Sequence, residues 1–401
     1  MRKNLFSLLA LACLSALVTV ASAPRLSAAD DPETAKFEAA MQKGIAYLKA
    51  QQNPDGSWGK DWKTGQPHGN IGITALIVDS LVIGPFGEDM KKSDTISKAV
   101  DFLLKSQNAA GAFAAPGEGD ENYYTCNVVI ALCAIDKDKY KDQVTKAVKF
   151  LEGCQCVEAQ GYDPKRHPLA FGGQGYGSAA KPDMGNTGFF IEALIAAGHP
   201  VDSKEFKDAM VFLHHCQASA EVNDLPWAKN IDPTRTDKGG GIYAPNDSAA
   251  GEVTDPRTGN KSWRAYGSMT YDLVKSYVYL DVKPDSPELK AAFQFIANNY
   301  SVDHNPGMGQ TGFYYYCLLM SKALNAYDQE VGSRYVKDAD GTEHDWSKEL
   351  GEKLVSLQTD GGFWQNTKDR WWETDPKLCT AYALVTFDQI LELRAKVADK
   401  K

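Results

Sequence analysis

Six segments of the chain repeat one pattern, in which an amphipathic helix is followed by a loop and then by a more apolar helix. The first helix of each pair carries Lys, Asp and Glu along one side, whereas the second is apolar over most of its surface. The intervals of 48 to 83 residues between successive first-helix ends suit helical hairpins with loops of variable length. The first helices end at Gln52, Gln107, Gln155, Gln217, Tyr300 and Gln358, where Tyr300 takes the place of Gln.

The contrast between the two helices predicts an outer layer of first helices around an inner layer of second helices. Neither terminal repeat has the polar face of a capping repeat, so we expect the six hairpins to close into a ring. The sequence therefore predicts an all-α (α/α)6 toroid, whose last pair packs against residues 39–48. The inner helices are expected at residues 71–83, 123–135, 187–197, 268–280, 312–326 and 378–391.

The loops that run from outer to inner helices are long and rich in Gly, Tyr, Trp and Asp, as in residues 155–183 and 217–266. The loops that return to the outer layer are mostly short. Because all inner helices start at the same end of the ring, one rim is expected to carry the elaborated loops and the positive ends of the inner-helix dipoles. Functional residues concentrate in such loops on a rigid scaffold, so this rim is the candidate functional face.

The N-terminal segment has the organisation of a secretory signal peptide. Arg2 and Lys3 precede an apolar run over residues 5–20, and small residues follow up to Ala23 and again up to Ala29. The run is short for a membrane anchor, and no other stretch is long enough for a stable span. We expect residues 1–29 to be removed, leaving residues 30–401 as one toroid domain, with repeats over about 39–392, in a secreted or periplasmic protein.

The charge balance excludes one class of partner. The chain has 43 Lys and Arg against 52 Asp and Glu, a net charge of −9, and loss of residues 1–29 would make it −12. A nucleic-acid-binding protein needs a basic surface for the phosphate backbone. We therefore expect no nucleic-acid partner.

Seven cysteines follow the signal segment, and most lie within apolar helical patterns. An odd number cannot pair completely, and this placement favours buried small hydrophobes over a disulfide framework. Cys154, Cys156 and residues 214–216 (His-His-Cys) end neighbouring outer helices, but convergence on one ion is not automatic for parallel side chains on helices ~8–10 Å apart. We expect no metal and no cofactor, with a Cys154–Cys216 disulfide as a minor alternative.

Residues 52–59 (QNPDGSWG) and 358–364 (QTDGGFW) resemble the Gln-Asp-Gly-Trp repeat of squalene and oxidosqualene cyclases, whose relatives include the β-subunits of protein prenyltransferases. Degenerate copies occur at residues 107–113, 173–177 and 240–243. The resemblance covers about residues 39–392 and implies an α/α toroid with a central apolar cavity. The motif itself is expected to be structural: Gln bridges backbone groups, Asp-Gly turns the chain and Trp packs on a helix end.

The catalytic motifs of these relatives are not matched. The Asp-x-Asp-Asp string of triterpene cyclases, the Asp-x-Cys and His zinc ligands of prenyltransferases and the Cys-Gly-Glu-Gln thioester of complement-type toroids do not occur at the corresponding positions. The resemblance thus implies a fold and leaves the activity open.

Two acids within the apolar helices are candidates for proton donation, since burial raises the pKa of a carboxyl group. Asp272 is the stronger candidate, and Glu192 is the weaker one. Lys275 lies one helical turn from Asp272, so the alternative is an ion pair that only serves packing.

Three further catalytic candidates lie at the rim, beside aromatic residues at the start of inner helices. Asp183 precedes residues 189–190 (Phe-Phe), and Glu373 and Asp375 follow residues 371–372 (Trp-Trp). The alternative is capping of the helix N-terminus, which Asp183 and Asp375 are placed to do. Both interpretations stay open for Asp375, and capping is favoured for the others.

Aromatic side chains near the inner-helix starts are candidates for the cavity wall, where they could contact a carbocation, an isoprenoid or a sugar ring. A tyrosine run within residues 313–316 must point in several directions around a helix, so core packing is the alternative for most of the set. The ligand-binding candidates are Tyr124, Phe190, Tyr271, Tyr315, Trp371 and Trp372.

Three functions remain open from the sequence. The first is an isoprenoid-handling enzyme or binder with an apolar ligand in the central cavity. The second is a carbohydrate-active enzyme, because glycosidases and lyases also use α/α toroids. The third is a ring for protein interaction, without catalysis. The lining of the cavity distinguishes them.

Overall fold

The computed structural model describes residues 32–60, 69–115, 117–178, 180–256 and 258–398. The signal segment predicted for residues 1–29 lies outside this range. The described chain is mostly helical, which confirms the predicted fold class, and its few strands form two short antiparallel hairpins.

Six buried helices form a closed ring, in which each helix contacts the next along the chain and the last contacts the first. Along this ring, α14 packs against both α12 and α2. The ring helices are α2 (Ile71–Val82), α5 (Glu121–Asp136), α7 (Met184–Ala197), α10 (Gly267–Tyr279), α12 (Phe313–Val331) and α14 (Pro376–Ala398).

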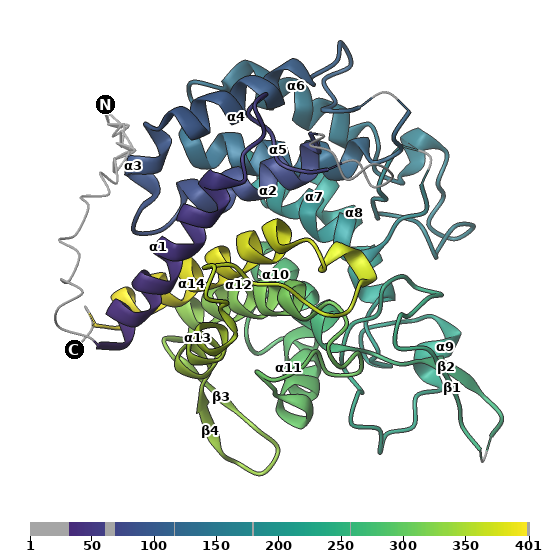
Figure 1. Cartoon of the computed structure of the whole chain (residues 1–401). Helices are drawn as coiled ribbons and strands as arrows, with labels where there is room; N and C mark the ends of the chain where they lie inside the picture. Colours follow the sequence, from purple (N-terminus) through teal and green to yellow (C-terminus); the bar gives the residue numbers. More distant parts are fainter. Residues whose placement is uncertain (1–31, 61–68, 116, 179, 257, 399–401) are drawn as a thin grey trace, which may run out of the picture.

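Amphipathic helices surround this ring and bury only their apolar side. In α4, for example, Ile96, Ala99, Val100 and Leu103 are buried, with the 3–4 residue spacing of one helix face. The helix α1 lies along α14 and α13, as Figure 1 shows, so the expected packing of the last pair on the first outer helix is confirmed. The outer helices are α1 (Pro32–Ala50), α4 (Asp94–Lys105), α6 (Lys141–Glu152), α8 (Lys204–His215), α11 (Pro287–Asn299) and α13 (Trp346–Leu357).

Shorter elements decorate the loops of the ring. The two hairpins pair β1 with β2 and β3 with β4, and both lie in loops (Figure 1). These short elements are α3 (Gly87–Lys91), η2 (Glu158–Gln160), α9 (Pro226–Lys229), β1 (Glu252–Thr254), β2 (Lys261–Trp263), β3 (Tyr335–Lys337), β4 (Glu343–Asp345) and η3 (Arg370–Trp372).

The repeated glutamine joins neighbouring outer helices. The Gln52 Nε2 atom donates to the carbonyl of Gly56 in its own loop and to the carbonyl of Thr95 on α4, both at 2.8 Å. Equivalent pairs of bonds reach the next outer helix from Gln107, Gln155, Gln217 and Gln358. In the fifth repeat the Tyr300 hydroxyl reaches α13 by donating to Glu349 at 3.0 Å.

The motif tryptophans fasten each loop to the helices on either side of it. The indole of Trp58 donates to the Leu48 carbonyl at 2.8 Å, and its backbone N–H donates to the Thr74 hydroxyl at 3.0 Å. Trp364 makes the same two kinds of bond, and both indoles are fully buried. The structural role predicted for the Gln and Trp positions of the motif is confirmed.

Candidate functional site

A cavity of about 360 Å³ opens at the rim where the inner helices begin. Asn70, Asp120, Asp183 and Tyr266 are the N-cap residues of α2, α5, α7 and α10, and all four line this cavity. The N-terminal ends of these helices therefore point their positive dipole ends at the same space. The rim chosen from the loop pattern is the one that carries the cavity.

The cavity wall is aromatic but carries many polar atoms. Phe189, Ile73, Met269 and Leu378 supply apolar surface, and Asn186 and Ser268 add an amide and a hydroxyl. Seven tyrosines also line it: Tyr123, Tyr124, Tyr176, Tyr243, Tyr266, Tyr315 and Tyr382. The wholly apolar chamber implied by the family resemblance is therefore not what the structure shows.

Asp183 is held in one position at the cavity wall. Its Oδ1 accepts from the Asn186 backbone N–H at 2.9 Å and its Oδ2 from the Asn186 amide at 2.7 Å, while the Tyr243 hydroxyl also donates to it. The side chain is 2% exposed, and burial raises the pKa of Asp183 to about 7 against the lowering effect of these hydrogen bonds. The carboxyl group thus caps α7 and keeps its proton up to near-neutral pH.

A second acidic group lies at the start of α5. Asp120 is half-buried, and burial together with the nearby Glu118 and Glu121 raises its pKa. Glu118 accepts a hydrogen bond of 2.6 Å from the Tyr124 hydroxyl. The cavity therefore holds two carboxyl groups in different environments, Asp183 deeply buried and Asp120 nearer to solvent.

A buried ionic network lies beneath the cavity. The Lys275 ammonium lies 2.9 Å from Asp272 and 3.2 Å from Glu192, and Lys322 forms a further ion pair with Glu192. Burial acts to raise the pKa of Glu192, but Lys322 and Lys275 outweigh it and hold the value at about 2. Gly188 leaves the room that Asp272 needs, since a Cβ there would lie 2.3 Å from Asp272 Oδ1.

The predicted site residues divide into two groups. The structure places Asp183, Tyr124, Tyr315, Trp371 and Trp372 in the cavity lining. The other five lie outside it, and their predicted roles need correction.

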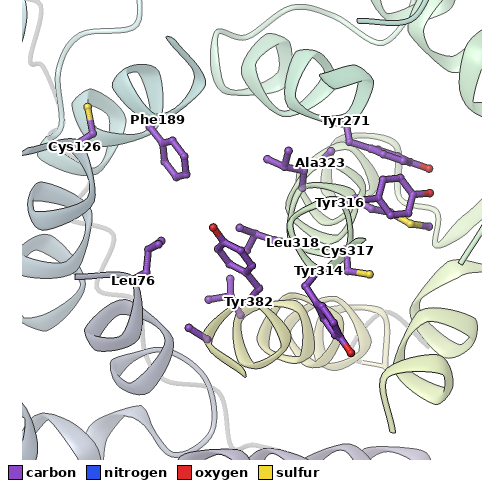
Figure 2. Close-up of a cluster of buried hydrophobic side chains, with 14 of the residues drawn as sticks. Leu76, Cys126, Phe189, Tyr271, Tyr314, Tyr316, Cys317, Leu318, Ala323 and Tyr382 are labelled. Atoms are coloured by element: carbon purple, nitrogen blue, oxygen red, sulfur yellow. The ribbon is translucent and has the colours of Figure 1, made fainter. Parts of the chain in front are cut away.

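Phe190 and Tyr271 are buried core residues outside the cavity lining. Phe189 lines the cavity, and a 100° step around α7 turns Phe190 into the packing, where it is fully buried. Tyr271 packs edge-on against Tyr316 with ring centroids 5.6 Å apart. Figure 2 shows Phe189 pointing to the ring centre and Tyr271 pointing away from it.

The three other catalytic candidates serve structure. Asp272 lies in the ionic network with Lys275, so the ion-pair alternative is the one the structure supports. Glu373 is fully buried and accepts from the Tyr315 backbone N–H at 2.8 Å at the start of α12. Asp375 accepts from the Lys377 backbone N–H at 2.9 Å and lies 3.2 Å from its ammonium, at the start of α14.

Sequence reasoning missed the loop tyrosines. Tyr176 and Tyr243 both line the cavity, and both fall within degenerate copies of the repeat motif, at residues 173–177 and 240–243. The shared position of a tyrosine after the glycines of two repeats was the available signal. Because the motif as a whole is structural, the sequence favours a scaffold role for this tyrosine position.

Three further features of the described residues bear on the site. Their seven cysteines are all unpaired. No group of three or more His, Cys, Asp and Glu side chains among them is arranged to hold a metal ion. A search of the same residues finds no helix with the length and apolar composition of a membrane span.

Residues 68–229 match the family model described as the squalene-hopene cyclase C-terminal domain. The match includes α2, α5 and α7, which supply half of the inner ring. The chain has an α/α toroid fold, and this part of it is similar to the squalene-hopene cyclase family. The chain carries a repeat motif that resembles the one of that family, without the family's catalytic acid motif.

Solved structures resemble this chain at low sequence identity. A protein from Actinoplanes is 17% identical over 90% of this chain and 99% of its own, with a TM-score of 0.50. An α-1,6-mannanase from Salegentibacter is 9% identical over 89% and 99%, with a TM-score of 0.53. A type II terpene cyclase from Scytonema, in complex with geranylgeranyl dihydroxybenzoate, is 12% identical over 90% and 99%, with a TM-score of 0.36.

Proposed function

We propose that the rim cavity binds a carbohydrate and that the protein acts on it with Asp183 as the proton donor. The observation that carries the proposal is the mixed lining of the cavity, in which aromatic rings and polar groups share one space. The C–H faces of a sugar ring pack on aromatic side chains, and its hydroxyl groups bond to carboxyl, amide and phenol groups.

The cost of desolvation separates this ligand from a hydrocarbon. A hydrocarbon that filled the cavity would remove water from Asp120, Asn186, Ser268 and several tyrosine hydroxyls without replacing its hydrogen bonds. Each buried polar group left without a partner costs about 1–3 kcal/mol. A sugar replaces these bonds while it still buries its apolar faces.

The two acids of the cavity suit acid–base chemistry on a glycosidic bond. Asp183, with a pKa of about 7, keeps a proton that it can donate to a leaving oxygen. Asp120 lies nearer to solvent in the same cavity and is our candidate for the carboxylate partner. Glycoside hydrolysis in most families uses such a pair, one acid and one carboxylate.

A second candidate function is the transformation of an isoprenoid. The protonated Asp183 favours it, since an acid of this kind can protonate an alkene, and the aromatic rings could stabilise the resulting cation. The family match to a squalene-hopene cyclase domain adds support. The polar groups of the cavity wall weigh against it.

Binding measurements distinguish the two ligands. We expect α-1,6-mannobiose or isomaltose to bind with one site per chain in calorimetry, and geranylgeraniol to bind weakly or not at all. Asp183→Asn should retain binding, because asparagine still caps α7, and should lower release of reducing sugar by about 10²–10⁴-fold. The exposed Asp202→Asn is the matched control and should leave both unchanged. Saturable binding of geranylgeraniol without saccharide binding would establish the second function instead.

We also propose that the protein is exported, on the basis of the basic start, apolar run and small-residue exits of residues 1–29. Mass spectrometry of the protein from its native source should find an N-terminus between about residues 24 and 30. An intact or acylated N-terminus would overturn this part of the proposal.

A further inference from the structure

Two adjacent tryptophans stand at the mouth of the cavity in an unusual backbone conformation. Trp371 and Trp372 have φ angles of 57° and 66°, in the left-handed region that favours glycine. They are 37% and 41% exposed, and both line the cavity. A left-handed conformation at a residue other than glycine costs on the order of 1–3 kcal/mol and persists only where the surroundings fix it.

The loop that carries the two tryptophans is fastened at its base. Asn366 donates from its backbone to the Glu373 carbonyl at 2.9 Å and from its amide to the Glu373 carboxylate at 2.6 Å. Glu373 also accepts from the Tyr315 backbone N–H on α12. The loop is thus joined to the ring by a buried carboxylate, which is the structural role of Glu373.

Contacts on Trp371 hold the tip of the loop. The Arg370 guanidinium lies 4.5 Å from the centre of the Trp371 ring. Gly312 lies against the same ring, where an added Cβ would come within 3.0 Å of it. Trp371 therefore serves as an anchor, and Trp372 is the more exposed of the two indoles beside the cavity mouth.

The opposite end of the cavity is closed. Phe189 and Tyr382 line its floor. The same two residues line a second space of about 10 Å³, together with Asp79 and Lys322 further along the ring axis. That space has room for about one water molecule. Below Phe189 and Ser268, the next turns of α7 and α10 carry Glu192 and Asp272 of the ionic network. Among the described residues, this closed floor leaves the mouth as the direction in which a ligand longer than the cavity extends.

We infer that the protein binds the end of an oligosaccharide chain, an inference that rests on the proposed carbohydrate function. The terminal sugar occupies the cavity, and Trp372 forms a stacking subsite for a following ring that projects from the mouth. A cavity of about 360 Å³ is at the lower end of the ~300–1,000 Å³ of small-molecule sites, so it holds a ligand of mono- or disaccharide size. The indole then increases the affinity for longer chains.

The test compares mannose with α-1,6-linked mannotriose and mannotetraose, and a parallel α-1,6-linked glucose series, in calorimetry of the full chain. We expect the tri- and tetrasaccharide of one series to bind about 10-fold more tightly than the monosaccharide, in line with an aromatic contact. Trp372→Ala should remove most of that gain, with a smaller effect on the monosaccharide. Trp372→Phe, which keeps a ring, should restore part of it.

Two controls make the outcomes separable. Tyr335→Ala removes an aromatic of 48% exposure on β3, outside the cavity lining, and should leave the whole series unchanged. Cooperative urea unfolding of Trp372→Ala at the wild-type midpoint shows that the variant is folded.

If wild-type protein binds the monosaccharide and gains nothing with chain length, or if Trp372→Ala retains the gain, the subsite is wrong and the proposed function stands. If no saccharide binds to the wild-type protein, the proposed function fails and the subsite fails with it.

Discussion

The Gln358 Nε2 atom donates a 2.8 Å hydrogen bond to the carbonyl of Ala40, joining residues 318 positions apart. The same atom donates to the Gly362 carbonyl at 2.9 Å. The bond between the last and first repeats is therefore of the same kind as the bonds between internal repeats, such as Gln52 to Thr95. The ring is therefore closed by the same glutamine–carbonyl hydrogen bond that joins neighbouring repeats.

We expect Gln358→Ala to destabilise the protein by about 1–3 kcal/mol, because it removes the two hydrogen bonds to the carbonyl groups of Ala40 and Gly362, each worth about 0.5–1.5 kcal/mol. Urea unfolding measures the loss. Gln51→Ala, at an exposed position after α1, is the control and should stay within about 0.5 kcal/mol of wild type. Equal stability of the two variants would mean that ring closure does not depend on this amide.

Lys275→Met is expected to cost about 3–5 kcal/mol, because it leaves Asp272 and part of Glu192 buried without their cation. The exposed pair of Lys283 and Asp281 provides the matched control, since Lys283→Met removes a cation that water already solvates. Thermal and urea unfolding of the two variants should differ clearly. A Lys275→Met variant as stable as Lys283→Met would show that the network tolerates loss of its centre.

Stability should fall as pH rises from about 5 to 8. Burial raises the pKa of Asp388 and Asp328 to about 7 and that of Asp79 to about 6, from an ordinary aspartate pKa of 3.8. Each folded carboxyl group holds its proton more tightly than the unfolded chain does, so its stabilising contribution is complete below the unfolded pKa and is lost as pH rises through the folded pKa.

Asp328→Asn tests this pH dependence at one site. The carboxylate accepts a 2.7 Å bond from the Trp346 indole, and an asparagine oxygen can accept the same bond without titrating. We expect the variant to lose less stability than wild type between pH 5 and 8 in urea unfolding. Parallel pH profiles for the two proteins would contradict the assignment.

Turnover should decline above pH 7 if Asp183 donates the proton, because its pKa is about 7 and only the protonated form is active. The pH dependence of kcat on a bound saccharide measures this pKa. Removal of the Asp183 hydrogen-bond donor by Tyr243→Phe should raise the pKa, since that bond lowers it, and move the decline to higher pH. A decline that stays in place would assign the proton to another group.

The repeat pattern was sufficient to predict the helical layers, because a helix face repeats every three to four residues in sequence and buries the same face in space. The predicted inner helix at 71–83 compares with Ile71–Val82 in the structure, and the one at 268–280 with Gly267–Tyr279. The two short strand hairpins were not predicted, since three-residue strands in loops carry no alternation to detect.

The candidate site was harder to predict than the scaffold. Asp183 was predicted from its position before an inner helix, where one acidic residue can both cap the helix and lie at the rim. The pattern could not separate Phe189 from Phe190, because the choice between cavity and core depends on the rotation of α7 against its neighbours. It also could not show that Trp372 lies at the rim whereas Glu373, one residue later, fastens the base of the loop. Both placements depend on the fold of the loop.

The sequence by itself determined the repeat, the two helix layers and the rim that carries the cavity, since these depend on periodic burial and on local loop composition. Only the tertiary structure decided which polar groups share one space. Tyr176, Tyr243 and Asp183 come from separate loops and a helix start, and they meet because the closed ring brings the inner-helix N-termini together. The tertiary structure also decided that Asp272 and Glu192 are structural, because Lys275 and Lys322 reach them only in the packed interior.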